Sequence, residues 1–337
     1  MPTKPAQQSP RRPRRRMRAA TLALALATVA GTLAALHLWL NTNAFGGSTL
    51  CGGAVATEEA EAVLTGPGRI SDRPGPRRTT ADGETGFDCV IERSAAGLPG
   101  SKTGRLHVQG TRERGDFAFT GGRWPDPSTV SFFPGGGVAP GRAWVQLPAA
   151  CTGRQAGVAE AYAEVGADPA KLVRLLTDTA NRISGRAGCA QSEPLSAPDR
   201  ITPAAPQRPA TAGSVCGLSG FTLPAVLRET VQDSGSTWSC GTAAGEGAEQ
   251  AYATFSATQD PAVIAGLRKS EGFTGQGFDA THTVTECSGK PTYFAMETGF
   301  RYTESLGTGA PAPQDLFTAF TKAAEARFGC AKPVEAH

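Results

Sequence analysis

Eight cysteines are the residues of this 337-residue chain whose type and spacing bear most directly on chemistry. No two of them stand in Cys-x-x-Cys spacing, and the histidine nearest to any of them in sequence is His282, five residues before Cys287. Zinc sites and thioredoxin-like redox centres need closely spaced thiols or histidines, so the spacing disfavours both and predicts no metal and no cofactor. The chemistry that remains is disulfide formation, which an even number of cysteines indicates where the chain is exported.

The cysteines fall into two sets of four. The first set is Cys51, Cys89, Cys151 and Cys189, and the second is Cys216, Cys240, Cys287 and Cys330. Each set opens with Cys-Gly and closes with Gly-Cys-Ala, which predicts an internal repeat derived from a duplicated domain. Within a set, neighbouring cysteines could be joined, or outer with outer and inner with inner. The equal spacing of 38 residues in the first set fits the neighbouring pairing, and the sequence leaves both pairings open.

Catalytic motifs are missing from the sequence. It contains no Gly-x-Ser-x-Gly, no His-Glu-x-x-His, no Ser-x-x-Lys and no phosphate-binding Gly-x-x-x-x-Gly-Lys. His107 and His282 are the only histidines in the part expected to fold outside the membrane. A lone histidine in a strand is more often a packed or surface residue than a catalytic base, so we expect neither of them to act in catalysis.

Paired carboxylates are the remaining route to hydrolytic chemistry, because glycoside hydrolysis uses two acids a few ångströms apart. The candidates, which are scattered along the sequence, are Asp116, Asp126, Glu286 and Glu297. Glu297 alternates with Tyr293, Ala295 and Gly299 on one face of a predicted strand, and we expect that face to be exposed to solvent. No pair is selected, and the sequence predicts a protein without catalytic activity.

The elements that position the cysteines begin with the last helix of each repeat. Asp168 and Pro169 supply the N-cap and first residue of one helix, and Gln314 and Asp315 open the other, which ends at Gly329. Apolar residues follow at offsets of three and four and predict the core. They are Leu172, Leu175, Leu176, Thr179 and Ile183 in the first helix, and Leu316, Phe317, Phe320, Ala324 and Phe328 in the second.

Short strands occupy much of the remainder, so each repeat is predicted to be a small α+β domain with an antiparallel sheet and helices. The strands expected in the first repeat are 87–91, 106–110, 117–120, 130–133 and 143–147. Those expected in the second are 238–240, 251–258, 281–287 and 292–298. Short helices are expected at 58–64 and, in the same place of the second repeat, at 224–231.

Two stretches of the first repeat, 66–86 and 121–142, are rich in Gly, Pro and Arg and are predicted to be long surface loops. The second contains the run from Phe132 to Gly137, with three consecutive glycines. We interpret this run as the end of a strand followed by a flexible loop, with a binding loop as the alternative.

The N-terminal residues predict a membrane anchor. Seven Lys and Arg residues and no acid precede residue 19, and Ala19–Leu40 carries no charge. Twenty-two helical residues extend about 33 Å, enough to cross a hydrocarbon core of ~30 Å. The positive flank favours a cytoplasmic N-terminus and extracytoplasmic domains. A signal peptide cleaved after Thr42-Asn43-Ala44 is the alternative, disfavoured because the apolar stretch is longer than a usual signal.

The expected organisation follows from these boundaries. It comprises a basic tail at 1–18, a transmembrane helix at 19–40, a stalk at 41–50, repeat 1 at 51–190, a Pro-rich linker at 191–213 and repeat 2 at 214–333. Without the seven tail cations, 26 Lys and Arg face 30 Asp and Glu. This mildly acidic balance does not support nucleic-acid binding, so the membrane, through Ala19–Leu40, is the expected partner.

The layout resembles a group of uncharacterised actinobacterial membrane-anchored or secreted proteins with tandem disulfide-bonded α/β domains. The resemblance lies in the Arg-rich flank before Ala19 and in Cys51-Gly52, Gly188-Cys189, Cys216-Gly217 and Gly329-Cys330. The group shares no catalytic motif, so the resemblance implies a compartment and a layout but no site residues.

The absence of catalytic motifs, together with the tandem domains, favours a noncatalytic ectodomain that binds an envelope protein or ligand. Two alternatives stay open: an extracytoplasmic hydrolase acting on envelope material, and a sensory ectodomain that works with a separate signalling partner. The tail of about eighteen residues before the apolar stretch is too short to hold an output domain of its own.

Overall fold

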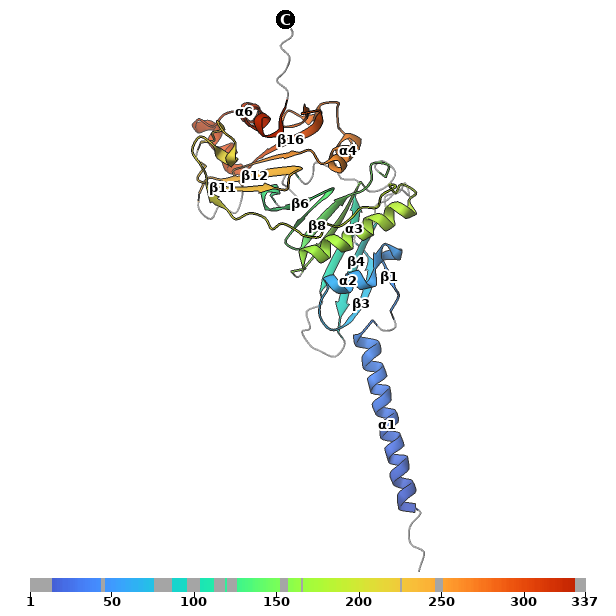
Figure 1. Ribbon diagram of the computed structural model, residues 1–337. Helices are drawn as coiled ribbons and strands as arrows, with labels where there is room; N and C mark the ends of the chain where they lie inside the picture. Colours follow the sequence, from blue (N-terminus) through green and yellow to red (C-terminus); the bar gives the residue numbers. More distant parts are fainter. Residues whose placement is uncertain are drawn as a thin grey trace, which may run out of the picture.

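The structure is a computed structural model that describes residues 14–43, 46–75, 87–95, 104–111, 119, 126–151, 157–164, 166–224, 226–245 and 251–330. A long helix, α1 (Arg14–Asn41), projects from a body that contains two seven-stranded antiparallel sheets (Figure 1). Within α1, Thr21–Trp39 is long and apolar enough to cross a membrane, with a mean hydropathy of 1.8. The mixed α+β class and the N-terminal apolar helix are as predicted.

We call residues 49–189 unit 1. Its sheet has the order β3-β4-β5-β9-β8-β7-β6. The strands are β1 (Thr49–Leu50), β2 (Val55–Ala56), β3 (Arg69–Pro74), β4 (Asp88–Ser94), β5 (Arg105–Thr111), β6 (Ser131–Phe133), β7 (Gly136–Ala139), β8 (Arg142–Gln146) and β9 (Val158–Ala163). The helices are η1 (Cys51–Gly53), α2 (Thr57–Val63), η3 (Pro127–Thr129) and α3 (Pro169–Arg186).

Helix α3 covers one face of this sheet and forms the core of unit 1. Asp168 caps it by accepting a hydrogen bond from the Lys171 amide at 3.0 Å, and Pro169 is its first residue, as the sequence predicted. All five residues of the predicted stripe, from Leu172 to Ile183, are buried against the sheet and α2. The helix therefore forms where its apolar period and its cap agree.

We call residues 208–330 unit 2. Its sheet has the order β10-β11-β12-β13-β16-β15-β14. The strands are β10 (Arg208–Pro209), β11 (Arg228–Asp233), β12 (Thr237–Ala243), β13 (Ala253–Thr258), β14 (Gly277–Asp279), β15 (His282–Cys287) and β16 (Lys290–Thr298). The helices are η4 (Val215–Gly217), α4 (Pro261–Lys269), α5 (Phe300–Ser305), η5 (Leu306–Thr308) and α6 (Pro313–Phe328).

The core of unit 2 is aromatic and centres on Phe320 of α6, which is fully buried. Its ring lies within about 6 Å, centroid to centroid, of five other aromatic rings. They belong to Phe221 (6.2 Å), Trp238 (6.0 Å), Phe255 (5.0 Å), Phe294 (5.9 Å) and Phe317 (6.0 Å). The predicted stripe of α6 is thus core, and Gly329, with φ of 66°, ends the helix as predicted.

All eight cysteines form disulfides, and the pairing that the sequence left open is the neighbouring one. The bonds are Cys51–Cys89, Cys151–Cys189, Cys216–Cys240 and Cys287–Cys330. In each unit the first bond ties a short turn to the second long strand, β4 or β12. The second bond of unit 1 ties the chain after α3 to Cys151, which follows β8, and that of unit 2 ties the chain after α6 to Cys287, the last residue of β15.

The short helix expected at 58–64 is α2, whereas the one expected at 224–231 is wrong. Residues 228–233 form strand β11, which pairs along its whole length with β12. Tertiary pairing overrides the local pattern here, because Glu229 and Gln232 on this strand are buried and bonded to neighbouring chain.

The strand expected at 130–133 is confirmed as β6, whereas the loop predicted at 121–142 is wrong for residues 136–139, which form β7 and pair with β6 in a buried hairpin. Its glycines serve close packing. A Cβ on Gly136 would lie 2.4 Å from the ring of Phe133, and one on Gly137 would lie 2.6 Å from the Trp144 indole nitrogen. The other predicted loop, 66–86, contains strand β3, and residues 76–86 lie outside the described residues.

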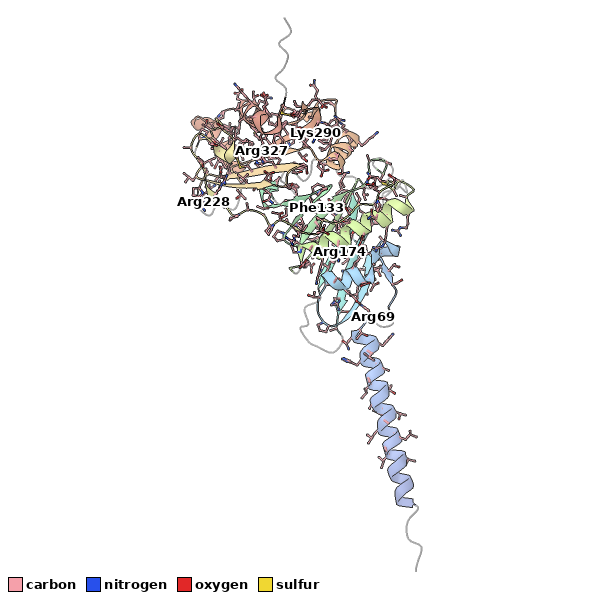
Figure 2. All side chains as sticks on the ribbon, in the orientation of Figure 1. Arg69, Phe133, Arg174, Arg228, Lys290 and Arg327 are labelled. Atoms are coloured by element: carbon pink, nitrogen blue, oxygen red, sulfur yellow. A yellow bond between two sulfur atoms is a disulfide. The ribbon has the colours of Figure 1, made fainter. Side chains whose placement is uncertain are left out.

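The two units pack against each other through an apolar cluster. Unit 1 contributes Phe119, Val130, Phe132, Ala139, Trp144 and Val158, and unit 2 contributes Val263, Ile264, Leu267, Tyr293 and Ala295. Phe133, labelled in Figure 2, lies on the hairpin at this junction. The hairpin, whose second strand the sequence predicted to be loop, is therefore part of the contact between the units.

Hydrogen bonds between described residues also join the units beside this cluster. Asp260, which caps α4, accepts from the Gly135 amide through Oδ2 at 2.8 Å. The Thr254 hydroxyl donates to Asp126 at 2.9 Å, and the Ser239 hydroxyl donates to the Pro127 carbonyl at 2.9 Å. A buried carboxylate that caps a helix in one unit and accepts a hydrogen bond from the other unit holds the two units in one relative orientation.

The Pro-rich chain between the units, residues 190–207, is extended and fastened at both ends, and we call it the strap. Leu195 exchanges two hydrogen bonds with the Asn181 side chain of α3, at 2.8 and 2.9 Å. Near its other end, the Ala205 amide donates to Gln232 of β11 at 2.9 Å. The strap therefore lies along both units as part of the fold.

Substituting Asp260 by alanine tests the contact between the units. We expect a loss of about 2–4 kcal/mol in the free energy of unfolding, because both the α4 cap and the partner of a buried Gly135 amide disappear. Asp168→Ala is the matched control: it removes the same kind of Asp-Pro cap from an exposed site and should cost about 1 kcal/mol. Urea unfolding of both variants measures the difference, and equal losses would contradict a role for Asp260 across the boundary.

Candidate functional site

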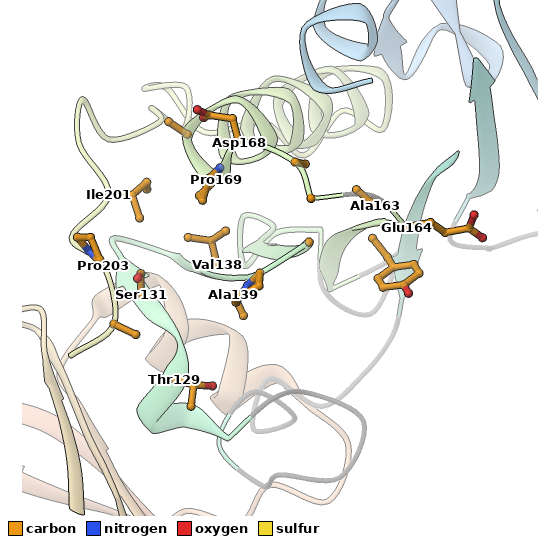
Figure 3. Close-up of a pocket in the computed structure, with 17 residues that line it drawn as sticks. Thr129, Ser131, Val138, Ala139, Ala163, Glu164, Asp168, Pro169, Ile201 and Pro203 are labelled. Atoms are coloured by element: carbon orange, nitrogen blue, oxygen red, sulfur yellow. The ribbon is translucent and has the colours of Figure 1, made fainter. Parts of the chain in front are cut away.

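A candidate site is a cleft of about 920 Å³ between the strap and the end of the unit 1 sheet. Figure 3 shows Ile201 and Pro203 of the strap on one side of it and Val138 and Ala139 of β7 on another. The start of α3, marked by Pro169, closes a third side. The remaining lining residues are Thr129, Ser131, Pro140, Gly141, Tyr162, Ala163, Glu164, Gly166, Ala167, Asp168, Ala170 and Ala204.

The cleft lies where the start of α3, strand β7 and the strap come together. The Asp168 cap fixes where the helix starts, and a gap remains between this start, β7 and the strap. The strap crosses this gap after its fastening to Asn181, and Ile201 packs against the unit 1 core. A space between sheet, helix start and strap follows from these three elements.

Two carboxylates line the cleft, and each is already engaged. Glu164 forms an ion pair with Arg105 at 3.0 Å, and Asp168 caps α3. Arg105 also bonds Glu92, and the bonds from Arg73 and Arg105 lower the pKa of Glu92 below its ordinary value. Tyr162 lies beneath the guanidinium of Arg142, which is 5.0 Å from the ring centroid.

His282 is held between two carboxylates in unit 2. Its Nδ1 is 2.8 Å from Asp279, and its Nε2 forms an ion-pair contact of 3.3 Å with Glu297. Burial disfavours the imidazolium, but the nearby Glu297 and Asp279 outweigh burial and raise the pKa of His282 above its ordinary value. With both ring nitrogens facing carboxylates, His282 has no nitrogen left to activate a nucleophile.

The other histidine, His107 of β5, pairs through Nε2 with Asp88 of β4. Neither His107 nor His282 is hydrogen-bonded to a serine in the part of the chain that the structure describes. These residues therefore form no Ser-His-Asp arrangement within that part.

The scattered carboxylates of the sequence analysis are not brought together. Asp116 lies outside the described residues. Asp126 bonds Ser128 and Thr254 at the junction of the units, and Glu286 is exposed beside Arg268. The expectation that the face of Glu297 is open to solvent is wrong, since Tyr293 and Ala295 on that face are fully buried between the units.

One group of metal-ligand type occurs among the described residues: Asp72 beside Cys51 and Cys89. Both sulfurs are joined in a disulfide, and the Asp72 carboxylate accepts a hydrogen bond from the Cys51 amide at 2.5 Å. A disulfide offers no thiolate to a metal, so this group is structural.

A coupled acidic pair lies between α2 and α3. Glu59 of α2 accepts two hydrogen bonds from Arg182 of α3, at 2.8 and 2.9 Å, and Asp178 of α3 is bonded to Glu59. Partial burial and the bond to Glu59 raise the pKa of Asp178 to about 6. Asp178 is therefore protonated below this pH and donates to Glu59.

Asp178→Asn should stabilise the protein at pH 8 and leave its stability unchanged near pH 3.5. The raised pKa of Asp178 contributes stability that is complete below the ordinary value and is lost as pH rises through about 6. Asparagine still donates a hydrogen bond to Glu59 and carries no charge, so the variant does not lose this stability. At pH 8 its free energy of unfolding should exceed that of the unchanged protein by about 1 kcal/mol, after allowance for solvent screening. Urea midpoints of the two proteins, measured from pH 3.5 to pH 8, test this expectation. A difference between the midpoints that stays constant over this range would contradict it.

The sequence did not predict the cleft, because its walls include β7, which was predicted to be part of a loop, and the strap, which was predicted to be a linker between the repeats. In comparisons with known proteins, no family model, no curated protein and no solved structure matches the chain.

Proposed function

We propose that this chain is a membrane-anchored, noncatalytic binding protein, held by α1 with both units outside the cytoplasm. Four disulfides indicate an oxidising compartment. The length and hydropathy of Thr21–Trp39 support a membrane span. The seven basic residues before residue 19 favour a cytoplasmic N-terminus.

The observation that carries the proposal is the attachment of α1 to unit 1. The Asn43 side chain accepts a hydrogen bond from the Ile70 amide at 2.7 Å and donates one to Glu61. The Gly68 amide donates a hydrogen bond to the Asn41 carbonyl at 3.2 Å. Arg69, labelled at the end of α1 in Figure 2, lies 5.8 Å from the ring of Trp39. The stalk expected at 41–50 is therefore bonded to the fold. Cleavage after Ala44 would remove these contacts, which favours an anchor that is kept.

The tandem repeat is part of the proposal, and the topology supports it. Each sheet runs through its first strands in chain order and then through the others in reverse order. Cys51 and Cys216 both have positive φ, 56° and 62°, in a short turn. The amide of each donates to an acid on the first long strand, Asp72 of β3 or Glu229 of β11, at 2.5 and 2.6 Å. A shared strained turn with the same bond favours duplication over chance.

Binding is favoured over hydrolysis by the site itself. The cleft is lined mainly by apolar side chains, whereas the histidines and carboxylates are engaged in internal pairs. Apolar clefts of several hundred Å³ with a few polar groups are typical of ligand sites. Hydrolysis of envelope material would instead require an activity that disappears on substitution of His107, His282 or a single carboxylate. A sensory role would require a separate signalling partner.

Capture from crosslinked envelope fractions tests the proposal. The bait is full-length protein in detergent, and the control is the same protein reduced and alkylated, which loses the disulfide-dependent fold. We expect a specific protein or small molecule to be recovered with the oxidised bait alone. Equal recovery with both baits, or no enrichment of either kind, would contradict a binding role.

A further inference from the structure

We propose that the cleft between the strap and unit 1 takes an uncharged, mainly aliphatic molecule whose hydroxyl or carbonyl group bonds Ser131. This inference rests on the proposed binding function and adds the chemical class of the ligand.

The size and walls of the cleft favour an aliphatic ligand. A volume of about 920 Å³ is that of a site for a small molecule. Val138 and Ala163 form a buried floor, and Ile201 and Pro203 of the strap lie across the cleft from Val138 (Figure 3). Alkyl side chains on both sides suit a hydrocarbon chain, because its burial removes apolar surface from water.

The charges around the cleft favour an uncharged ligand. Among the described residues that line it there is no lysine or arginine, and the two acids are Glu164 and Asp168. An anionic ligand would meet two carboxylates, and the nearby Arg105 is already paired with Glu164, which disfavours such a ligand. A cationic ligand would find both acids already engaged, Glu164 by Arg105 and Asp168 by the start of α3.

Ser131 supplies the polar group that orients the ligand. It lies on the edge strand β6, lines the cleft and is 6 % exposed. In the part of the chain that the structure describes, its hydroxyl makes no hydrogen bond. Ser131 Oγ is not one of the buried side-chain oxygens without a partner, so the hydroxyl is accessible from the cleft and a ligand can take the place of water as its hydrogen-bond partner. Because a hydroxyl both donates and accepts, a ligand hydroxyl or carbonyl suits it equally.

Photolabelling of the full-length protein in lipid nanodiscs tests this assignment. The probes are diazirine-bearing decanol, decanoate and decylammonium, and labelled peptides are located by mass spectrometry. We expect decanol to label 138–141 and 201–204 at least about tenfold more than either charged probe. Equal labelling of this region by all three probes, or labelling confined to α1, would overturn the assignment.

Two variants sharpen the test. Ala204→Trp, on the partly exposed strap, should fill the cleft and remove the labelling while the urea midpoint stays unchanged. Ser131→Ala should weaken competition by unlabelled decanol about tenfold, the effect of one hydrogen bond, and leave competition by decane unchanged. Labelling that survives Ala204→Trp would overturn the assignment. Envelope capture that succeeds without any decanol labelling would leave the proposed function standing and reject this ligand class.

Discussion

Phe320→Ala lowers the free energy of unfolding of unit 2 by about 3–5 kcal/mol. Phe320 is fully buried, and its ring is the common neighbour of five other aromatic rings, so truncation leaves a cavity that several rigid side chains would have to fill. These rings can move little to fill the cavity, because Trp238, Phe255 and Phe294 are residues of strands in the sheet. Urea unfolding followed by tryptophan fluorescence reports the loss directly, since Trp238 stacks on Phe320.

Phe300→Ala is the matched control for this experiment. It makes the same chemical change at the start of α5, where the ring is 68 % exposed. We expect a change within about 0.5 kcal/mol of zero. A similar loss in both variants would mean that the aromatic cluster is not the core of unit 2.

Removing the Cys151–Cys189 disulfide, as Cys151→Ala together with Cys189→Ala, destabilises unit 1 by about 4 kcal/mol. The bond closes a loop of 38 residues, and its removal returns conformational entropy to the unfolded chain. It also frees the chain after α3 from the sheet. Alanine avoids the buried hydroxyl that serine would introduce at these positions, which are 1 % and 5 % exposed.

The control for the disulfide variant is Ala150→Ser with Ala190→Ser, at the exposed residues beside the two cysteines. Its unfolding free energy should match that of the unchanged protein within about 0.5 kcal/mol. Hydrogen exchange of α3 amides would locate the effect. A disulfide variant as stable as its control would contradict a structural role for the bond.

Much of the fold could be predicted because local signals agree with tertiary packing in the terminal helices. The stripes that contain Leu172 and Phe320 have the helical period, and Asp168-Pro169 and Gly329 mark the ends. The strands that carry Cys89 and Cys240 were equally clear. In these segments the pattern of apolar and polar residues is set by a single contact, the core of the same unit.

The wrong predictions concern segments whose structure depends on a further contact, with another strand or with the other unit. Gly136 and Gly137 are typical of a loop, yet they serve close contact with Phe133 and Trp144. The face of Tyr293 and Ala295 alternates like an exposed strand face, yet it is covered by the other unit. Nothing local in the sequence signals the contact between the sheets, so neither the junction nor the cleft beside it could be derived.

The contact between the units changes how a binding role would operate. Tandem modules on a free linker gain avidity by engaging a target independently. Here Asp260 and Asp126 join the units, and the strap is fastened to Asn181 and Gln232. Both units would therefore present one fixed surface, with unit 1 next to α1 and unit 2 farther from it (Figure 1).

The central claim is that α1 is kept and that the two units lie outside the cytoplasm. Protease treatment of intact cells, followed by mass spectrometry of the membrane-bound fragments and of the untreated protein, tests it most directly. We predict an untreated membrane protein that retains residues 14–41 with all cysteines oxidised, and a protected N-terminal fragment after protease treatment. A soluble protein that begins near residue 45, or units that resist protease until the cells are lysed, would contradict the claim.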